Sequence, residues 1–381
     1  MNRGMQIDWG ARIDEMGPNF RSIASEVDRQ GSFVADNYAQ LAQAGILAAA
    51  VPRELGGGGA SLEEVARLLC RLAHYCSSTA LAVSMHQHLV AAGVWRYLHD
   101  QPAEALLRRV AGDQLVLVST GGADWLKSNG TLRPVPGGYL ATAIKPFASG
   151  SPAGDLVITS AVLAEPGEPP QVFHFSAPMS APGVILHNDW DALGMRGTGS
   201  STLEFKDVFI PEAAISVRRP QAGWPAVWSV VATIAPPIYC APYVGIAERA
   251  ATVAREILIE RHSRGAPADP SNNTEVLIGE MENALLTAQW AFDFCIQNAK
   301  NYDFMPDVQR ANRTLQAKTI LVKAVTETVN KAMEAVGGAS YLRKVGLEQL
   351  FRDLRGAAFH PLPEKRQQWM TGRLALGQSP A

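Results

Sequence analysis

The sequence predicts an α+β fold, in which a helical N-terminal domain precedes a middle antiparallel β-barrel and a C-terminal four-helix bundle. Two changes in hydrophobic period support this prediction. Helical spacing holds over residues 1–115, short segments separated by Gly and Pro fill residues 116–215, and helical spacing returns over residues 216–381. Short strands separated by Gly and Pro are typical of a small antiparallel barrel or sandwich. We therefore expect three domains with these boundaries.

Helix start and stop signals are clear in the first 115 residues. Asp36–Gly45 is an amphipathic pattern closed by a glycine, as at many helix C-termini. Ser61–Glu64 has the spacing of a capping box, which predicts a helix that continues to Cys76. Thr79–Tyr97 is almost entirely apolar on one side and predicts a third helix.

The middle segment changes from helical spacing to short strand patterns. The alternation or apolar character of six segments predicts strands, at Leu115–Val118, Tyr139–Thr142, Leu156–Val162, Gln171–Phe175, Gly183–Leu186 and Thr202–Ile210.

Long helical patterns joined by short loops follow, as in an antiparallel bundle. The expected helices are Val244–Glu260, Asn273–Lys300, Asp307–Val336 and Ala339–Leu354, with a last one from Glu364 to Leu376. Ala226–Ala241 is the most apolar window, and its prolines favour a buried helix start over a membrane span.

Composition excludes several functional classes. Basic and acidic residues nearly balance, 34 against 36, so we expect neither a nucleic-acid surface nor a membrane surface. No secretory leader pattern is visible, which favours the cytoplasm. The cysteines lack a Cys-x-x-Cys spacing, so we expect free thiols and no metal site; they are Cys70, Cys76, Cys240 and Cys295.

One segment carries most of the functional information. Asn188–Pro211 contains Trp190, then the run LGMRGTGS, and then the last expected strand. Its glycines and hydroxyls form a loop whose backbone N–H groups can approach a polar ligand closely. This segment resembles the signature of the acyl-CoA dehydrogenase superfamily of flavoproteins. The resemblance implies that superfamily's three-part fold and a flavin bound between the β-domain and the bundle, FAD in preference to FMN.

The resemblance also assigns residues to the flavin. Lys145–Gly150 stands where the family has K-x-W-I-T/S, which implies that Phe147 packs on the isoalloxazine ring and that Ser149 hydrogen-bonds near flavin N5. Ser119, beside the first expected strand, joins these two as a cofactor-binding candidate.

Two further matches to the family predict contacts with the dinucleotide part of the flavin cofactor. Arg261 stands where the family has an arginine that binds the pyrophosphate of a neighbouring subunit's cofactor. Gly337 and Gly338 match a glycine pair that lets the chain pass close to the dinucleotide. The resemblance therefore implies a homotetramer or homodimer.

The catalytic base of the family is missing. Family dehydrogenases use a glutamate shortly after an R-D-x-R motif, and this position falls on Pro361. The other family location, near Val231–Pro237, also lacks an acid. The candidates for catalysis are then His360, which follows Arg352-Asp353-x-Arg355, with Glu364, His88 and His86.

Three functions remain open. The first is a dehydrogenase that acts on acyl-CoA or another acyl thioester and passes electrons to an electron-transfer flavoprotein; family-wide features favour it. The second is a flavin-dependent monooxygenase that uses reduced flavin from a reductase, together with O₂, on a small molecule. Its histidines would handle protons. The third is a binding relative of the fold without turnover.

Overall fold

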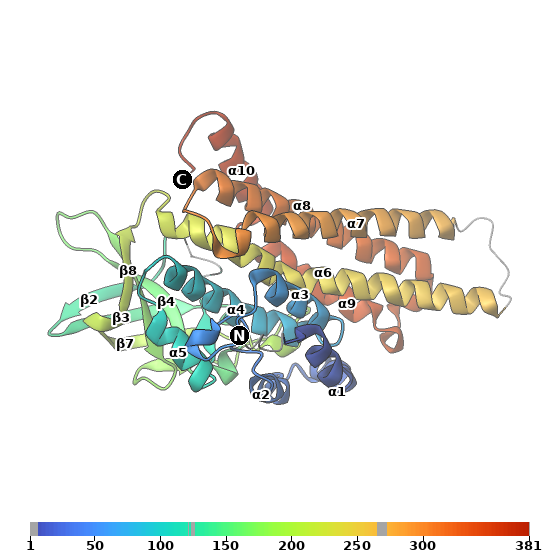
Figure 1. Cartoon of the computed structure of the whole chain (residues 1–381), viewed down its shortest axis with the longest axis horizontal. Coiled ribbons are helices and arrows are strands. Elements are labelled where there is room, and N and C mark those ends of the chain that lie inside the picture. Colours follow the sequence, from blue (N-terminus) through green and yellow to red (C-terminus); the bar gives the residue numbers. More distant parts are fainter. Residues whose placement is uncertain (1–6, 121, 123–125, 265–272, 381) are drawn as a thin grey trace, which may run out of the picture.

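The computed structural model describes residues 7–120, 122, 126–264 and 273–380. The expected three parts are present (Figure 1): N-terminal helices and a long C-terminal bundle lie together, and the β-domain sits at one end. The fold class predicted from the sequence is therefore confirmed.

The N-terminal helices begin and end close to the predicted signals. Ser61 accepts from the Glu64 backbone, and the Glu64 side chain accepts from the Ser61 backbone, so the capping box at α3 is confirmed. The helices are α1 (Trp9–Gln30), α2 (Ala35–Gln43), α3 (Leu62–Ala73), α4 (Ser77–Leu98) and α5 (Glu104–Gly112).

The β-domain is an eight-stranded sheet in the described residues, with strand order β6-β7-β3-β2-β4-β5-β8 and with β1 paired to β4. The pairings of β1 and of β2 with β4 are parallel, which the prediction of a wholly antiparallel sheet did not include. The strands are β1 (Leu117–Ser119), β2 (Thr131–Val135), β3 (Gly138–Lys145), β4 (Leu156–Leu163), β5 (Gln171–Pro178), β6 (Val184–Leu186), β7 (Leu203–Pro211) and β8 (Ile215–Pro220).

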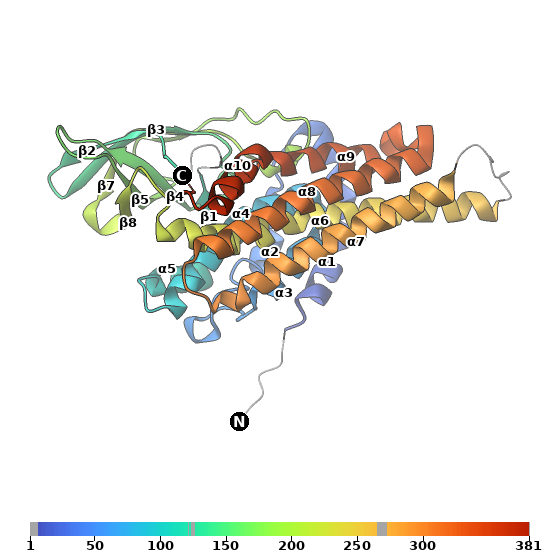
Figure 2. The same ribbon diagram turned by 90° about the horizontal axis from the view of Figure 1, so that it is seen from above.

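The long helices α6 (Ala226–Ser263), α7 (Thr274–Asn298) and α8 (Val308–Val336) lie side by side, as Figures 1 and 2 show. α6 joins the predicted buried helix start at Ala226–Ala241 to the helix predicted from Val244. It continues through three prolines because its first half is buried, and packing there outweighs the lost backbone hydrogen bonds. α6 is long and apolar enough to cross a membrane, but 94% of its most apolar window is buried inside the protein. Its composition is that of a core helix, as expected.

The predicted helix Ala339–Leu354 is wrong over its first half. The chain forms two short 3₁₀ turns there, and α9 (Leu347–Leu354) starts only after Gly346, which has φ of 81°. Glycines in this left-handed region interrupt a helix without strain. The last helix, α10 (Glu364–Ala375), matches its prediction.

The two helical parts share one hydrophobic core. Buried residues of α1 to α5 and of α6 to α9 belong to a single contiguous cluster, whereas the β-domain has a cluster of its own around Phe175 and Phe205. At Gly245 of α6 a Cβ would lie 2.2 Å from the Cys70 carbonyl oxygen of α3, so the two helix backbones are in contact.

Two adjacent residues of α9 join all three parts. Arg352 donates to both carboxylate oxygens of Asp28 in α1, at 2.8 and 2.6 Å. Asp353 accepts from the Ser77 hydroxyl at the start of α4 and from the Met195 backbone N–H, each at 2.5 Å. Met195 belongs to the LGMRGTGS loop, so these contacts fix that loop against both helical parts.

His86 forms a second link between parts. Its Nε2 lies 2.9 Å from the Leu47 carbonyl, and its Nδ1 accepts from the Leu117 N–H of β1 at 3.0 Å. Burial lowers its pKa to about 4. Both ring nitrogens of His86 have backbone partners, which gives this residue a structural role between the helical part and β1.

We expect Asp353→Asn to destabilise the protein. An amide has one acceptor atom, so one of the two donors would face an NH₂ group, at a loss of about 1–3 kcal/mol in the free energy of unfolding. Urea unfolding near pH 7 measures this. Asp113→Asn, on an exposed carboxylate at the end of α5, is the control. Equal stability of the two variants would contradict the role of Asp353.

We expect His86 to make stability depend on pH. The unfolded chain binds a proton at this imidazole below about pH 6.5, whereas the folded chain does not until about pH 4. Its contribution is therefore lost as the pH falls through this window. His86→Gln should reduce the slope of unfolding free energy against pH by up to about 1.4 kcal/mol per unit. The exposed His262→Gln serves as control; matching slopes in both variants would refute the assignment.

Candidate functional site

His88 projects from α4 beside the first strand of the β-domain. Its Nε2 lies 3.2 Å from the Ser119 hydroxyl, so two predicted site residues meet here. Desolvation lowers the pKa of His88 to about 4, and the Ser84 backbone opposes that shift. Nδ1 of His88 has no hydrogen-bond partner of standard geometry among the described residues. His88 is therefore neutral at pH 7.

His360 lies in the loop between α9 and α10. Its Nε2 is 2.7 Å from the Tyr243 hydroxyl, and its ring stacks on Tyr239 with centroids 5.1 Å apart. Burial, followed by the charges of Lys318 and His88, lowers the pKa of His360 to about 3. The two histidines therefore lie close enough to influence each other. Both residues are partly exposed rather than fully buried.

The His360 loop is held by side chains that the sequence did not single out. Lys318 of α8 donates to the carbonyls of His360 and Leu362, at 3.0 and 3.1 Å. The Tyr239 hydroxyl donates to the Pro361 carbonyl at 2.6 Å. Lys318 is only 2% exposed, and a lysine on the buried face of a helix was the one sequence signal that could have revealed it.

The acids nearest to His360 in the sequence have other partners. Glu364 begins α10, where its carboxylate lies 2.8 Å from Lys323 and accepts from Gln368. Asp353 is committed to Ser77 and Met195. Glu364 thus occupies the first turn of a helix, where an acid is favourable, and the histidines are the stronger catalytic candidates.

Phe147 and Ser149 follow β3 in the β-domain. Phe147 is 57% exposed and has φ of 62°, an uncommon conformation for a bulky residue. Ser149 Oγ is 2.7 Å from Ser200 Oγ, which is 2.6 Å from Thr198 Oγ1 of the Gly-rich loop. An exposed aromatic ring can pack on the isoalloxazine ring, and neighbouring hydroxyls can hydrogen-bond its polar atoms, so these residues fit a flavin.

Arg261 and the two glycines lie at the far end of the bundle. Arg261 Nη1 donates to the Val336 carbonyl, one residue before Gly337, at 2.9 Å. A Cβ on Gly337 or Gly338 would meet nothing within 4 Å. Packing within one chain therefore does not require glycine there, and the site predictions for these residues stay predictions.

Comparison with known proteins identifies the relatives of this chain. Residues 17–114 match the model of the acyl-CoA dehydrogenase N-terminal domain, and residues 238–363 match that of the C-terminal domain. The amino sugar nitrososynthase RubN8 of Streptomyces rubradiris is 29% identical over 91% of this chain and 84% of its own. The dibenzothiophene monooxygenase of Mycolicibacterium goodii is 26% identical over 91% of this chain and 88% of its own.

A solved structure agrees over nearly the whole length. KijD3, in complex with FMN and dTDP-3-amino-2,3,6-trideoxy-4-keto-3-methyl-D-glucose, matches with a TM-score of 0.85 at 28% identity, over 97% of this chain and 94% of that one. Flavin is thus the cofactor of the relatives, as the resemblance implied. The chain belongs to the acyl-CoA dehydrogenase family and is a flavin-dependent oxidoreductase of that fold.

Proposed function

We propose that this protein is a flavin-dependent monooxygenase that oxygenates a nucleophilic nitrogen or sulfur atom of a small molecule. One observation carries the proposal: His88 from α4 and His360 from the α9–α10 loop are both neutral at pH 7 and partly exposed, and they lie close enough for His88 to contribute to the lowered pKa of His360. The relatives named above act on an amino sugar and on dibenzothiophene, which supports a heteroatom as the target.

Both histidines are neutral at pH 7, so each ring has one nitrogen that can accept a proton. A bound reduced flavin supplies the activation of O₂. His88 can hold or accept a proton at Nε2, where Ser119 fixes the ring, and Tyr243 fixes the ring of His360. Lys318 and Tyr239 keep the backbone of the His360 loop in place, so that its imidazole stays oriented.

The alternative, acyl thioester dehydrogenation, needs a strong base for an α-carbon proton. The family positions for this base carry Pro361 and an acid-free segment near Val231. Glu364 forms an ion pair with Lys323 instead. These residues favour oxygenation, which needs no carboxylate of this kind.

The proposal includes partners. Reduced flavin would come from a separate reductase, and the relatives' FMN complex makes FMN as plausible a cofactor as FAD. An exposed stripe on α7, Leu286, Trp290 and Phe294, repeats every four residues and suits contact with a second copy of the chain in a homodimer or homotetramer. Arg261 and the glycine pair would then reach a neighbour's cofactor. Four free thiols support a cytoplasmic location.

We expect flavin chemistry to separate the two activities. Acyl-CoAs of several chain lengths, mixed anaerobically with the flavin-loaded protein, should leave the oxidised flavin absorbance unchanged. With reduced flavin and air, amine and thioether substrates should yield oxygenated products in mass spectrometry. Bleaching by an acyl-CoA, with no oxygenated product, would instead establish the dehydrogenase.

We expect His360→Ala to lower product formation by about 10²–10⁴-fold, the usual contribution of a general acid or base, while flavin affinity stays unchanged. Tyr243→Phe, which leaves the imidazole but removes its partner, should have a smaller effect. The control is the exposed His187→Ala. Wild-type product formation by His360→Ala would remove this residue from the site.

A further inference from the structure

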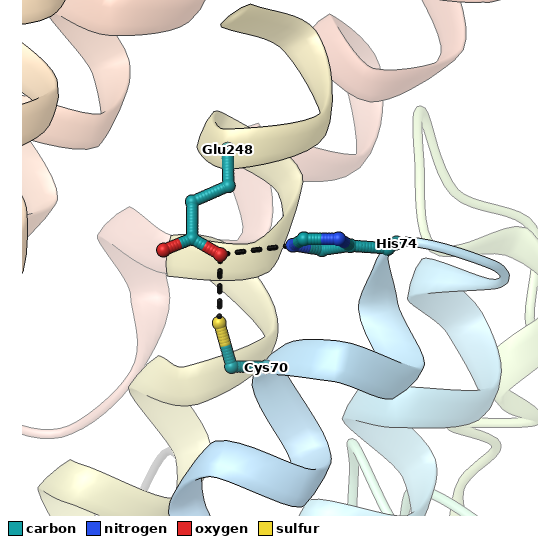
Figure 3. Close-up of side chains that lie close together, drawn as sticks. All are labelled: Cys70, His74 and Glu248. Atoms are coloured by element: carbon teal, nitrogen blue, oxygen red, sulfur yellow. Dashed lines mark hydrogen bonds and ion pairs between the residues drawn. The ribbon is translucent and has the colours of Figure 1, made fainter. Parts of the chain in front are cut away.

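The contact between α3 and α6 brings together three side chains of a kind that binds metal ions. Cys70 lies in α3 and His74, four residues later, is the residue that caps its C-terminus, while Glu248 stands one turn after Gly245 on α6 (Figure 3). Because the two helix backbones touch at Gly245, the three side chains converge.

The distances between their polar atoms are short. Glu248 Oε2 lies 2.8 Å from His74 Nε2 and 3.3 Å from Cys70 Sγ, and all three atoms lie within 4.8 Å of one another. Around a tetrahedral Zn²⁺ such atoms would be roughly 3.3–3.5 Å apart, given its usual bond lengths. Small side-chain movements would therefore admit an ion.

We propose that Cys70, His74 and Glu248 form a zinc site that joins the N-terminal helices to the bundle. Thiolate, imidazole and carboxylate are the ligands that Zn²⁺ takes, whereas Mg²⁺ and Ca²⁺ prefer oxygen alone. On binding, the Cys70 S–H bond breaks, its proton goes to solvent, and an S–Zn bond forms. The thiolate and carboxylate then balance the two charges of the ion.

The surroundings of these three residues suit a metal site. Gln289 donates to the other carboxylate oxygen of Glu248 at 2.9 Å, which leaves Oε2 directed at the cluster. Two nearby arginines of α3 have acidic partners, since Arg67 pairs with Asp293 and Arg71 with Asp14. Their positive charges are therefore offset.

The cluster is also accessible to an ion. Cys70 is 7% exposed, but the side chains of His74 and Glu248 are 21% and 25% exposed. Water can thus enter and complete a fourth position, as in zinc sites with three protein ligands. Such a site would add a direct bond between helices that already share one core.

Cobalt binding to the full-length, chelator-treated protein tests the proposal. We expect one Co²⁺ per chain, with a thiolate-to-metal charge-transfer absorption that Zn²⁺ abolishes on displacement. We also expect Zn²⁺ to raise the melting temperature. A wild-type chain that shows neither the absorption nor a stoichiometry near one would overturn the site.

Matched variants identify the ligands. Cys70→Ala should lose the charge-transfer absorption, and His74→Gln and Glu248→Gln should each weaken Zn²⁺ binding by about tenfold or more. Cys295→Ala, which removes a buried thiol from the α7–α8 contact, should bind as the wild type does. Far-UV circular dichroism and flavin binding confirm that each variant is folded. Undiminished metal binding by the folded Cys70→Ala would exclude the assignment.

Discussion

The rest of the structure depends on one buried carboxylate, that of Asp353, which accepts hydrogen bonds from two donors, and on the arginine that precedes it. Asp353 receives one hydrogen bond from the N-terminal helices and one from the Gly-rich loop, and Arg352 pairs with Asp28. Burial raises the pKa of Asp353 to about 6, ahead of the opposing effect of its two donors. The carboxylate thus bears a desolvation penalty that its contacts with Ser77 and Met195 partly offset.

This contact also positions residues of the predicted flavin site and of the histidine site. The Gly-rich loop continues from Met195 to Thr198 and Ser200; the Ser200 hydroxyl contacts Ser149, and the Thr198 hydroxyl contacts Ser200. α9 leads from Asp353 directly into the loop that carries His360. One local interaction therefore connects the Gly-rich loop with the chain segment that leads to His360.

Much of this arrangement could be predicted from the sequence, because it depends on local signals. The capping box at Ser61, the helix after Pro363 and the Gly-rich signature are short patterns with a direct physical cause. The helix predicted from Ala339 was wrong over its first half, because the backbone conformation at Gly346 interrupts it. Lys318 and the Glu248 cluster were missed because their partners lie 42 and 174 residues away. The favoured reaction also differs between sequence and structure. Family-wide motifs in the sequence favoured a dehydrogenase, whereas the two histidines favour a monooxygenase.

The shared interior of the two helical parts has a consequence for how such chains can diverge. Since the N-terminal helices and the bundle bury the same apolar surface, neither can be exchanged or trimmed without exposing the other. The sheet encloses its own interior and tolerates changes in its connecting segments more freely. New substrate preferences should therefore arise by variation in the β-domain loops, while the helical framework is inherited as a whole.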